Sequence, residues 1–407
     1  MLTSTIPVQA SSESLPTLTH KRISSIDFLR GLVIIIMALD HVRDYVHADS
    51  MIIDPADLTK TTTALFFTRW ITHFCAPVFM FLAGTSAFLI SQRKSLKELS
   101  KFLFTRGLWL MILELTVVNF SWFFNSQFPS IYLAVIWALG LGMIILALLI
   151  HLPYRVLLSI GLLIIFGHNL LDNIHVPGNG IGSILWAELH ERRRFEIWGH
   201  EVGTAYPILP WLGIMITGYC FGQLYRKDKV PAMRKKYLKY LGTGACALFI
   251  VLRGINMYGD MTPWEQQASP IFTILSFLNV TKYPPSLLYT LMTLGPAILL
   301  LSVTENIQGH LPKAIISIGR VPMFFYILHI YFIHLFAMFA ISQMGHPWTD
   351  MILTGWPWTQ PQLKGYGFSL EVTYLIWFML ILILYPLCRW YDRYKSSHKD
   401  KWWLSYL

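Results

Sequence analysis

An apolar stretch from Arg22 to His47 combines the length of a membrane-spanning helix with an unusual density of charge. It reads RISSIDFLRGLVIIIMALDHVRDYVH and exceeds the roughly 20 residues that a helix needs to cross the hydrocarbon core. Within it lie the ionisable side chains of Asp27, Arg30, Asp40, His41, Arg43 and Asp44. Charge at membrane depth is costly, so such residues usually face a bundle interior or a water-filled cavity. The stretch therefore predicts a helix that forms one wall of a functional site.

Helical geometry makes this prediction more specific. At about 100° and 1.5 Å per residue, the steps from Arg30 to His41 return to within roughly 20° of one face and rise about 16 Å. Asp27 and Asp44 fall in the same sector, whereas His47 would point roughly 120° away from His41. Arg30 and His41 are therefore expected to line one polar cavity at two depths.

The whole chain has the composition of a membrane protein. Its 407 residues are 55% hydrophobic and only 13% charged, with a mean hydropathy of +0.51, which is too apolar for a water-soluble globule. We therefore predict an all-α fold, a polytopic bundle of about ten transmembrane helices, each approaching or exceeding the length of a spanning helix. The expected spans are 26–46, 64–90, 102–124, 130–150, 154–171, 207–225, 237–257, 284–303, 314–341 and 369–391.

Lysines and arginines gather in alternate loops, which tests the number of spans independently of hydropathy. Ten alternating spans place most of them on one side, which the positive-inside rule assigns to the cytoplasm together with both termini. This distribution accounts for the net charge of +10 without a nucleic-acid partner. Residues 1–20 are expected to be a disordered cytoplasmic tail, 21–394 the transmembrane domain, and 395–407 a second cytoplasmic tail.

Two connections are more elaborate than plain loops. The arginines at 192–194 fall outside in this topology, within the longest external connection, 172–206, and long connections tend to be functional. We expect a partly folded lid over the outer mouth of the cavity. The piece 259–283 contains an apolar run too short to span and is expected to be interfacial or re-entrant.

His41 is the residue of the first span best suited to chemistry. Histidine titrates near neutral pH and can take a proton from an attacking hydroxyl or amine, with Asp40 or Asp44 orienting the ring. The alternative is a structural polar cluster that ties this helix to its neighbours. His47 would act as the base instead if the helix unwinds near the outer surface, and would otherwise be an interfacial histidine.

Three further residues are assigned to the donor. Arg30, nearer the cytoplasm, carries a planar guanidinium suited to a phosphate or carboxylate, although an internal pair with Asp27 on the same face is an equal alternative. His329 lies well within the bilayer and is assigned a lining role, the alternative being a hydrogen-bonded packing residue. Arg320 lies near the cytoplasmic end of the same run, on the opposite face from His329.

Residues nearer the outer face are candidates for binding the acceptor. Arg69 and His73 are four apart and share a helix face, beside a proline that should kink the helix. Trp211, Lys282 and Tyr283 belong to proline-rich stretches in which aromatic rings and a cation could stack on a sugar. An ordinary membrane-end cluster and an aromatic belt are the respective alternatives.

Motifs of soluble enzymes give no assignment. The sequence shows no Walker loop, dinucleotide fingerprint, nucleophile-elbow serine or zinc spacing. No metal is predicted.

Several blocks together resemble a known family. The chain is similar to bacterial relatives of the heparan-alpha-glucosaminide N-acetyltransferase catalytic domain, and more distantly to the membrane acyltransferase-3 group, whose arginine, ten residues, histidine arrangement is matched by Arg30 and His41. The blocks are SIDFLRGLVIIIMALDHVRDYVH, FFTRWITHFCAPVFMFLAGTSAF, YPILPWLGIMITGYCFG, LNVTKYPPSLLYTLMTLGP and GRVPMFFYILH.

The resemblance implies a transmembrane acyltransferase of the bacterial cytoplasmic membrane. It would move an acetyl group from cytoplasmic acetyl-CoA to a hydroxyl or amine, expected to be on a sugar or glycan, at the outer face. His41 would then be the base and Arg30 would help hold the donor. The expected partners are the lipid bilayer, acyl-CoA and the acceptor, and a homodimer is left open.

One departure keeps His47 as an alternative base. The lysosomal enzyme of the family carries an asparagine where His41 aligns, and its active histidine comes later. Direct transfer and an acetyl-histidine relay are both chemically open. The rival function is a proton-coupled transporter or channel that uses the same buried charges, and an inactive scaffold is a third reading.

Overall fold

The computed structural model describes residues 22–51, 53–226, 228–398, 400–401 and 404. The predicted tail at 1–20 lies outside the described residues. At the other end, the last long helix continues to Ser397, so the first residues of the predicted second tail are helical.

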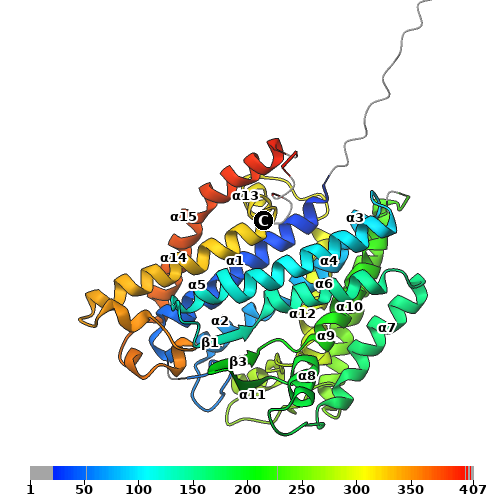
Figure 1. Cartoon of the computed structure of the whole chain (residues 1–407). Coiled ribbons are helices and arrows are strands. Elements are labelled where there is room, and N and C mark those ends of the chain that lie inside the picture. Colours follow the sequence, from blue (N-terminus) through cyan, green and yellow to red (C-terminus); the bar gives the residue numbers. More distant parts are fainter. Residues whose placement is uncertain (1–21, 52, 227, 399, 402–403, 405–407) are drawn as a thin grey trace, which may run out of the picture.

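The described chain is mostly helical (Figure 1). Its α-helices are α1 (Ser24–Val46), α2 (Thr63–Thr72), α3 (Cys75–Ser91), α4 (Leu96–Leu113), α5 (Asn119–Phe123), α6 (Val135–Leu149), α7 (Tyr154–Gly167), α8 (Ile181–His190), α9 (Ile208–Phe221), α10 (Pro231–Ile255), α11 (Pro270–Leu278), α12 (Leu287–Val303), α13 (His310–Gly319), α14 (Pro322–Gln343) and α15 (Leu370–Ser397). A π-helical turn, η2 (Glu114–Val118), joins α4 to α5. Short 3₁₀ turns are η1 (Ala48–Met51), η3 (His168–Leu171), η4 (Gly222–Tyr225), η5 (Trp348–Met351), η6 (Pro357–Thr359) and η7 (Pro361–Leu363).

A polytopic membrane protein is confirmed by the length and composition of these helices. Within the described residues, seven helical stretches are long and apolar enough to cross a bilayer: Thr63–Ser91, Leu96–Phe123, Tyr154–Leu171, Ile208–Tyr225, Pro231–Ile255, Pro322–Gln343 and Leu370–Ser397. Each corresponds to one of the ten expected spans. The remaining three expected spans correspond to the shorter apolar helices α6 and α12 and to the charged helix α1.

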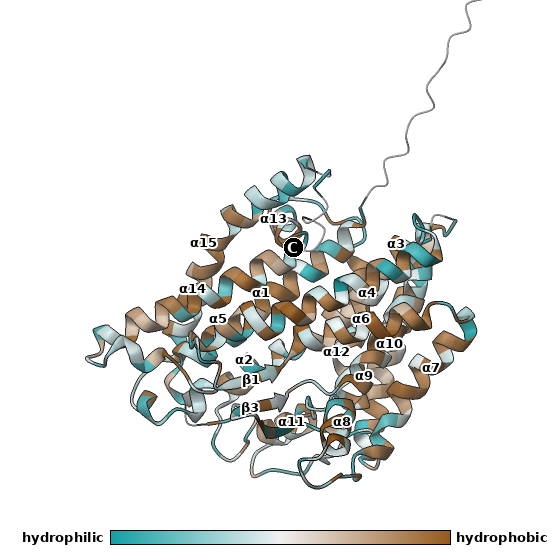
Figure 2. Cartoon of the chain, viewed as in Figure 1, coloured by the Kyte–Doolittle hydropathy of each residue, from teal (hydrophilic) through white to brown (hydrophobic). Residues whose placement is uncertain are grey.

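The outer surface of the bundle suits contact with lipid. Hydrophobic residues are concentrated in the long helices and hydrophilic ones in the connections at their ends (Figure 2). Large apolar side chains are exposed on three peripheral helices, as on a membrane-facing surface. Examples are Leu163 on α7, Ile250 on α10, and Leu375 and Phe378 on α15.

The helix directions define two ends of the bundle. One, called here the basic end, carries the start of α1, the connections with Arg93 and Arg226, and Lys313 in the first turn of α13. The other, called the sheet end, carries a small sheet, α8, α11 and the connection 344–369 (Figure 1).

The sheet is a departure from the all-α prediction. Strands β1 (Ser130–Leu133), β2 (Arg193–Ile197) and β3 (His200–Thr204) form it in the order β1-β3-β2, with β3 parallel to β1 and antiparallel to β2. The segment 172–206 is therefore folded, since it contains α8 and the β2–β3 hairpin. Strands β2 and β3 were missed because they are short and largely polar, so that hydropathy alone does not mark them, whereas β1 lies at the start of an apolar run that predicts a helix.

Two expected spans change their boundaries. The run at 130–150 begins as β1, so its helix α6 starts only at Val135. The run at 314–341 is interrupted after Arg320, where α13 ends and α14 begins with Pro322 at its first position. Proline lacks an N–H and favours the first turn of a helix, which explains the break.

Helix α1 lies inside the bundle, and glycines bring other backbones close to it. It packs against α13, α14, α15, α2 and α3. A Cβ added at Gly31 would collide with the carbonyl group of Ile315 on α13, and one at Gly319 would collide with the carbonyl group of Asp27 on α1. Small residues allow such close approach of helices in membranes, where dispersion contacts replace the hydrophobic effect.

We expect Gly31→Ala to destabilise the protein by about 1–3 kcal/mol, because the new methyl group must push α13 away from α1. The measurement is the unfolding midpoint in detergent. Gly244→Ala in α10 is the matched control, since its Cβ meets no neighbour within 4 Å. Equal midpoints for the two variants would contradict the close packing of α1 on α13.

Candidate active site

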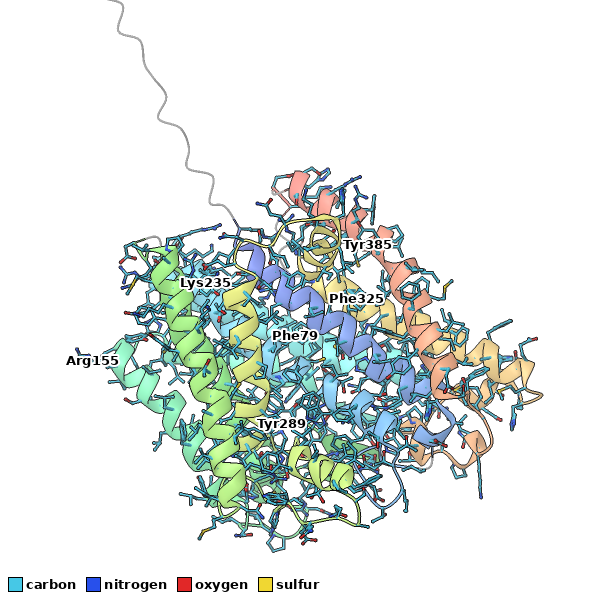
Figure 3. The ribbon with its side chains drawn as sticks, turned by 180° about the vertical axis from the view of Figure 1, so that it is seen from behind. Phe79, Arg155, Lys235, Tyr289, Phe325 and Tyr385 are labelled. Carbon is cyan, nitrogen blue, oxygen red and sulfur yellow. The ribbon has the colours of Figure 1, made fainter. Side chains whose placement is uncertain are left out.

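A cavity of about 1400 Å³ runs beside α1 and has lining residues from both ends of the bundle. Arg22 and Arg226 line it at the basic end, and Lys282 and Trp358 line it at the sheet end. Figure 3 shows Phe79, another lining residue, among the central helices, whereas Arg155 projects from the periphery on α7. The polar stripe predicted on α1 is part of this lining: Asp27, Arg30, Asp40, His41, Arg43 and Asp44.

His41 makes a hydrogen bond to His329 that fixes the roles of both rings. The Nδ1 atom of His329 lies 3.1 Å from the carbonyl oxygen of Phe325, which can only accept, so this nitrogen carries the proton. Nε2 of the neutral His329 ring is then an acceptor and receives the Nδ1–H of His41 at 2.7 Å. The neutral His41 ring therefore keeps its lone pair on Nε2, as a general base requires.

Aromatic rings hold His41 in place within the cavity wall. The ring of Trp122 meets it edge-on with centroids 4.8 Å apart, and the ring of Tyr326 lies at 6.3 Å. Both residues also line the cavity. The His41 ring is therefore fixed by packing as well as by its bond to His329, which favours a single orientation for chemistry.

Asp40 is bound to arginines on two helices. Its Oδ1 lies 2.7 Å from Nη1 of Arg43, and its Oδ2 lies 2.5 Å from Nη1 of Arg69 on α2. Arg43 also binds Asp44, with Nη2 and Oδ1 2.6 Å apart. The structure thus places both carboxylates in an ion-pair network, and the group that bonds to His41 is His329, which the sequence analysis had assigned to the donor.

Arg30 combines the two roles considered for it. Its guanidinium donates to Asp27 at 3.0 Å, to Ser86 on α3 at 2.9 Å and to the carbonyl oxygen of Gly319 at 3.3 Å, and it also lines the cavity. Arg320 approaches the same Asp27 carboxylate at 3.5 Å and lines the cavity too.

The cavity is strongly cationic at the basic end. Nine lining residues there are basic: Arg22, Arg30, Arg93, Arg106, Arg226, Lys229, Arg234, Arg320 and Lys395. Among the described lining residues, Asp27 is the one carboxylate at this end. Arginine and lysine in this density favour a ligand with several negative charges, such as a phosphorylated nucleotide.

Lys282, Tyr283 and Arg192 form a cationic wall at the sheet end. The Nζ of Lys282 lies 5.1 Å from the centre of the Tyr283 ring, and the guanidinium carbon of Arg192 lies 4.9 Å from it. Burial alone would raise the pKa of Tyr283, but the positive charges of Lys282, Arg69 and Arg192 outweigh it and lower the pKa to about 8. A shifted pKa beside a cavity is typical of functional sites.

His73 lies at the break between α2 and α3 and lines the same part of the cavity. Its backbone oxygen accepts a hydrogen bond from the Tyr289 hydroxyl at 2.7 Å. The ring is 5% exposed, and its Nδ1 is buried without a hydrogen-bond partner in the described structure. A buried polar atom of this kind is expected to meet a ligand or water.

Three predicted residues lie away from the cavity lining: Trp211, His47 and His329. His329 was predicted to line the cavity, but it is fully buried on α14 and bonds instead to His41. Trp211 is fully buried on α9, where it packs against Tyr206 and Tyr289. His47 caps the C-terminus of α1, and its backbone pairs with Phe368. The structure therefore brings His41, and not His47, to the cavity.

An aromatic wall that begins beside His41 was not predicted from the sequence. Trp356 meets Trp122 edge-on at 5.0 Å and stacks on Trp358 at 5.2 Å, and all three line the cavity. The GWPW stretch at 355–358 carries the signal, because tryptophans in a polar connection are unusual. It lies far from α1 in sequence, so only the fold reveals that it meets Trp122, which in turn contacts His41.

A comparison with family models identifies a family for the larger part of the chain. The model described as heparan-alpha-glucosaminide N-acetyltransferase, catalytic, matches residues 22–258, which include His41, Arg69 and His73. A direct comparison with curated proteins gives no match. The match covers more than half of the chain and confirms the predicted relationship. The chain belongs to the heparan-alpha-glucosaminide N-acetyltransferase catalytic-domain family.

Proposed function

We propose that this protein transfers an acetyl group from acetyl-CoA in the cytoplasm to a hydroxyl or amine acceptor on the opposite side of the membrane. The observation that carries this proposal is the cavity beside α1, whose lining includes residues of the basic end, His41, and residues of the sheet end. Membership of the family implies acetyltransferase activity with acetyl-CoA as the donor.

The basic end faces the cytoplasm in this proposal. The positive-inside rule favours that orientation, because Arg93 and Arg226 in connections and Lys313 at the start of α13 gather at this end. Ten spans, made by the seven long stretches together with α1, α6 and α12, are consistent with both termini at the same end. The bacterial cytoplasmic membrane is the proposed location.

The donor enters with its phosphates at the basic end. The phosphate groups of CoA are held by arginines and lysines of the basic end. The pantetheine arm passes Arg30 and Arg320 toward His41. The rise from Arg30 to His41 along α1 is about 16 Å, so an extended arm can connect the two levels. The thioester is thereby placed beside the base.

His41 acts as the base in the transfer step. Its Nε2 takes the proton of the acceptor while the acceptor oxygen or nitrogen attacks the thioester carbonyl. The tetrahedral oxyanion is stabilised by the positive charge of Arg69 and by a hydrogen bond from the His73 ring, and then collapses with breakage of the carbon–sulfur bond. The CoA sulfur leaves and receives the proton from the His41 imidazolium. Direct transfer of this kind needs no acetyl-histidine intermediate.

His329 is a positioning residue for this reaction. Its Nε2 accepts from His41 Nδ1, so it holds the ring in the tautomer whose Nε2 is free to act as a base. It also stabilises the imidazolium that forms when His41 is protonated.

The acceptor binds at the sheet end. The rings of Trp122, Trp356 and Trp358 offer flat apolar faces beside His41, and such faces suit the hydrophobic side of a sugar ring. Lys282 and Tyr283, which line the same cavity, supply polar groups. A sugar or glycan hydroxyl or amine is therefore the proposed acceptor.

Replacement of His41 by alanine is expected to reduce acetyl transfer by at least about 100-fold, because the reaction loses its base. The assay follows free CoA thiol released by purified protein from acetyl-CoA with a panel of amino sugars and glycans. His151→Ala, at an exposed turn, is the control and should retain activity. If His47→Ala lost most of the transferase activity while His41→Ala retained it, the base would be His47. Solute uptake into vesicles without CoA release would favour a transporter.

Replacement of His329 by leucine should lower kcat about 10- to 100-fold while leaving the KM for acetyl-CoA nearly unchanged, since the Nδ1–H of His41 loses its acceptor. Steady-state kinetics separate the two constants. Leu335→Ala, on the exposed side of the same helix, is the matched control. A rise in KM without a fall in kcat would show that His329 binds the donor instead of positioning the base.

The double variant Arg93→Ala with Lys229→Ala is expected to raise the KM for acetyl-CoA about 3- to 10-fold with little change in kcat. The two exposed charges of the basic end contribute modestly to donor binding and are screened by salt. Lys97→Ala, exposed at the start of α4 and outside the cavity lining, is the control. The difference between variant and wild type should shrink at high ionic strength. An unchanged KM for acetyl-CoA at low salt would show that the CoA phosphates do not bind at the basic end.

A further inference from the structure

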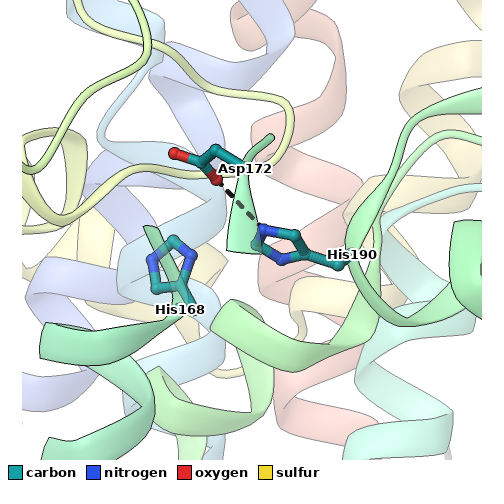
Figure 4. A group of neighbouring side chains, drawn as sticks. All are labelled: His168, Asp172 and His190. Atoms are coloured by element: carbon teal, nitrogen blue, oxygen red, sulfur yellow. Dashed lines mark hydrogen bonds and ion pairs between the residues drawn. The ribbon is translucent and has the colours of Figure 1, made fainter. Parts of the chain in front are cut away.

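A second polar cluster lies at the sheet end, outside the cavity lining. Figure 4 shows His168, Asp172 and His190 with their side chains converging. His168 begins η3 after α7, Asp172 follows η3, and His190 is the last residue of α8. One ligand atom from each side chain lies within 4.8 Å of the other two.

The cluster is buried and incompletely paired. Both histidines are 3% exposed, and the Asp172 side chain is 8% exposed. The Nε2 atom of His190 lies 3.0 Å from Oδ1 of Asp172, which accounts for one nitrogen. The Nδ1 atoms of His168 and His190 are both buried without a hydrogen-bond partner in the described structure. The unpaired imidazole nitrogen of His168 is costly unless something binds there.

The donor set has the chemistry of a transition-metal site. Two imidazoles and one carboxylate are ligands that zinc accepts in tetrahedral sites, with water completing the coordination. Asn169 donates to the other carboxylate oxygen of Asp172 at 2.8 Å, as the outer groups that orient metal ligands do. The separation of 3.0 Å between His190 and Asp172 is close to the ligand spacing of about 3.3 Å in a zinc tetrahedron. The ligand atom of His168 lies within 4.8 Å of the other two, so a short inward movement of its ring reaches this spacing.

We propose that His168, Asp172 and His190 bind a zinc ion that fastens the folded segment 172–206 to the end of α7. The sequence spacing did not reveal this site, because α8 and the turn before it bring His190 back to His168. Its position indicates a structural role, since none of the three residues lines the cavity beside α1.

The site would also position part of the cavity wall. His190 is followed within two residues by Arg192, whose guanidinium lies over the Tyr283 ring, and then by β2. The carbonyl oxygen of Glu191 accepts from Thr204 on β3 at 3.0 Å. An ion at His190 therefore restrains the start of the hairpin from which Arg192 reaches the cavity. This inference does not depend on the proposed reaction.

The test is zinc binding by the full-length protein in detergent. Protein stripped with a chelator is titrated with zinc chloride, and bound metal is measured by mass spectrometry after desalting. We expect one zinc per chain, and substitution with Co²⁺ should give the visible absorption of a tetrahedral nitrogen and oxygen site. Zinc should also slow tryptic cleavage at 192–194. Wild-type protein that retains no zinc, or cobalt with only an octahedral spectrum, would overturn the proposal whatever the variants do.

Variants assign the ion to the cluster. His168→Gln and Asp172→Asn should each weaken zinc binding by at least about 100-fold, because loss of even an outer-shell partner costs 10- to 100-fold. His175→Gln is the matched control, since His175 belongs to the same segment but is exposed. Equal zinc affinity in all three variants would place the metal elsewhere, and adventitious binding would show no fixed stoichiometry.

Discussion

The cost of burying charge at membrane depth governs the rest of this structure. Helix α1 carries its charges into the bundle, and each carboxylate finds a cation: Asp27 meets Arg30 and Arg320, while Asp40 meets Arg43 and Arg69. Removing one partner of such a pair would leave an uncompensated buried charge, which costs far more than the pair contributes. The helices around α1 are therefore held where they supply these partners and leave a cavity beside them.

The same ion pairs occupy Asp40 with structural contacts and leave His41 to a different partner. Because the arginines engage Asp40, this carboxylate is not the hydrogen-bond partner of His41, and a neutral histidine from α14 takes that place. A neutral partner fixes the tautomer of His41 without adding a further ion to the interior. The charge needed for the proposed reaction then arises only when the base accepts a proton, in a setting already organised to stabilise it.

The folded segment 172–206 joins the sheet to the cavity at the sheet end. The strand β1 between α5 and α6 pairs with β3, so residues far apart in sequence form one sheet beside the cavity (Figure 1). Arg192 and Tyr206 reach the cavity from this segment, whereas α8 stays outside it. Contact with the cavity and the proposed fastening of the segment thus involve different residues of one small unit.

The sequence by itself determined the membrane class, most of the spans and the polar stripe of α1, because hydropathy and the 3.6-residue period of a helix are local properties. It also predicted that Arg30 and His41 share a cavity wall. Only the tertiary structure decided which groups meet: His329 beside His41, Trp356 beside Trp122, and His168 beside His190. These pairs join segments distant along the chain, and packing of whole helices, which no local pattern encodes, brings them together.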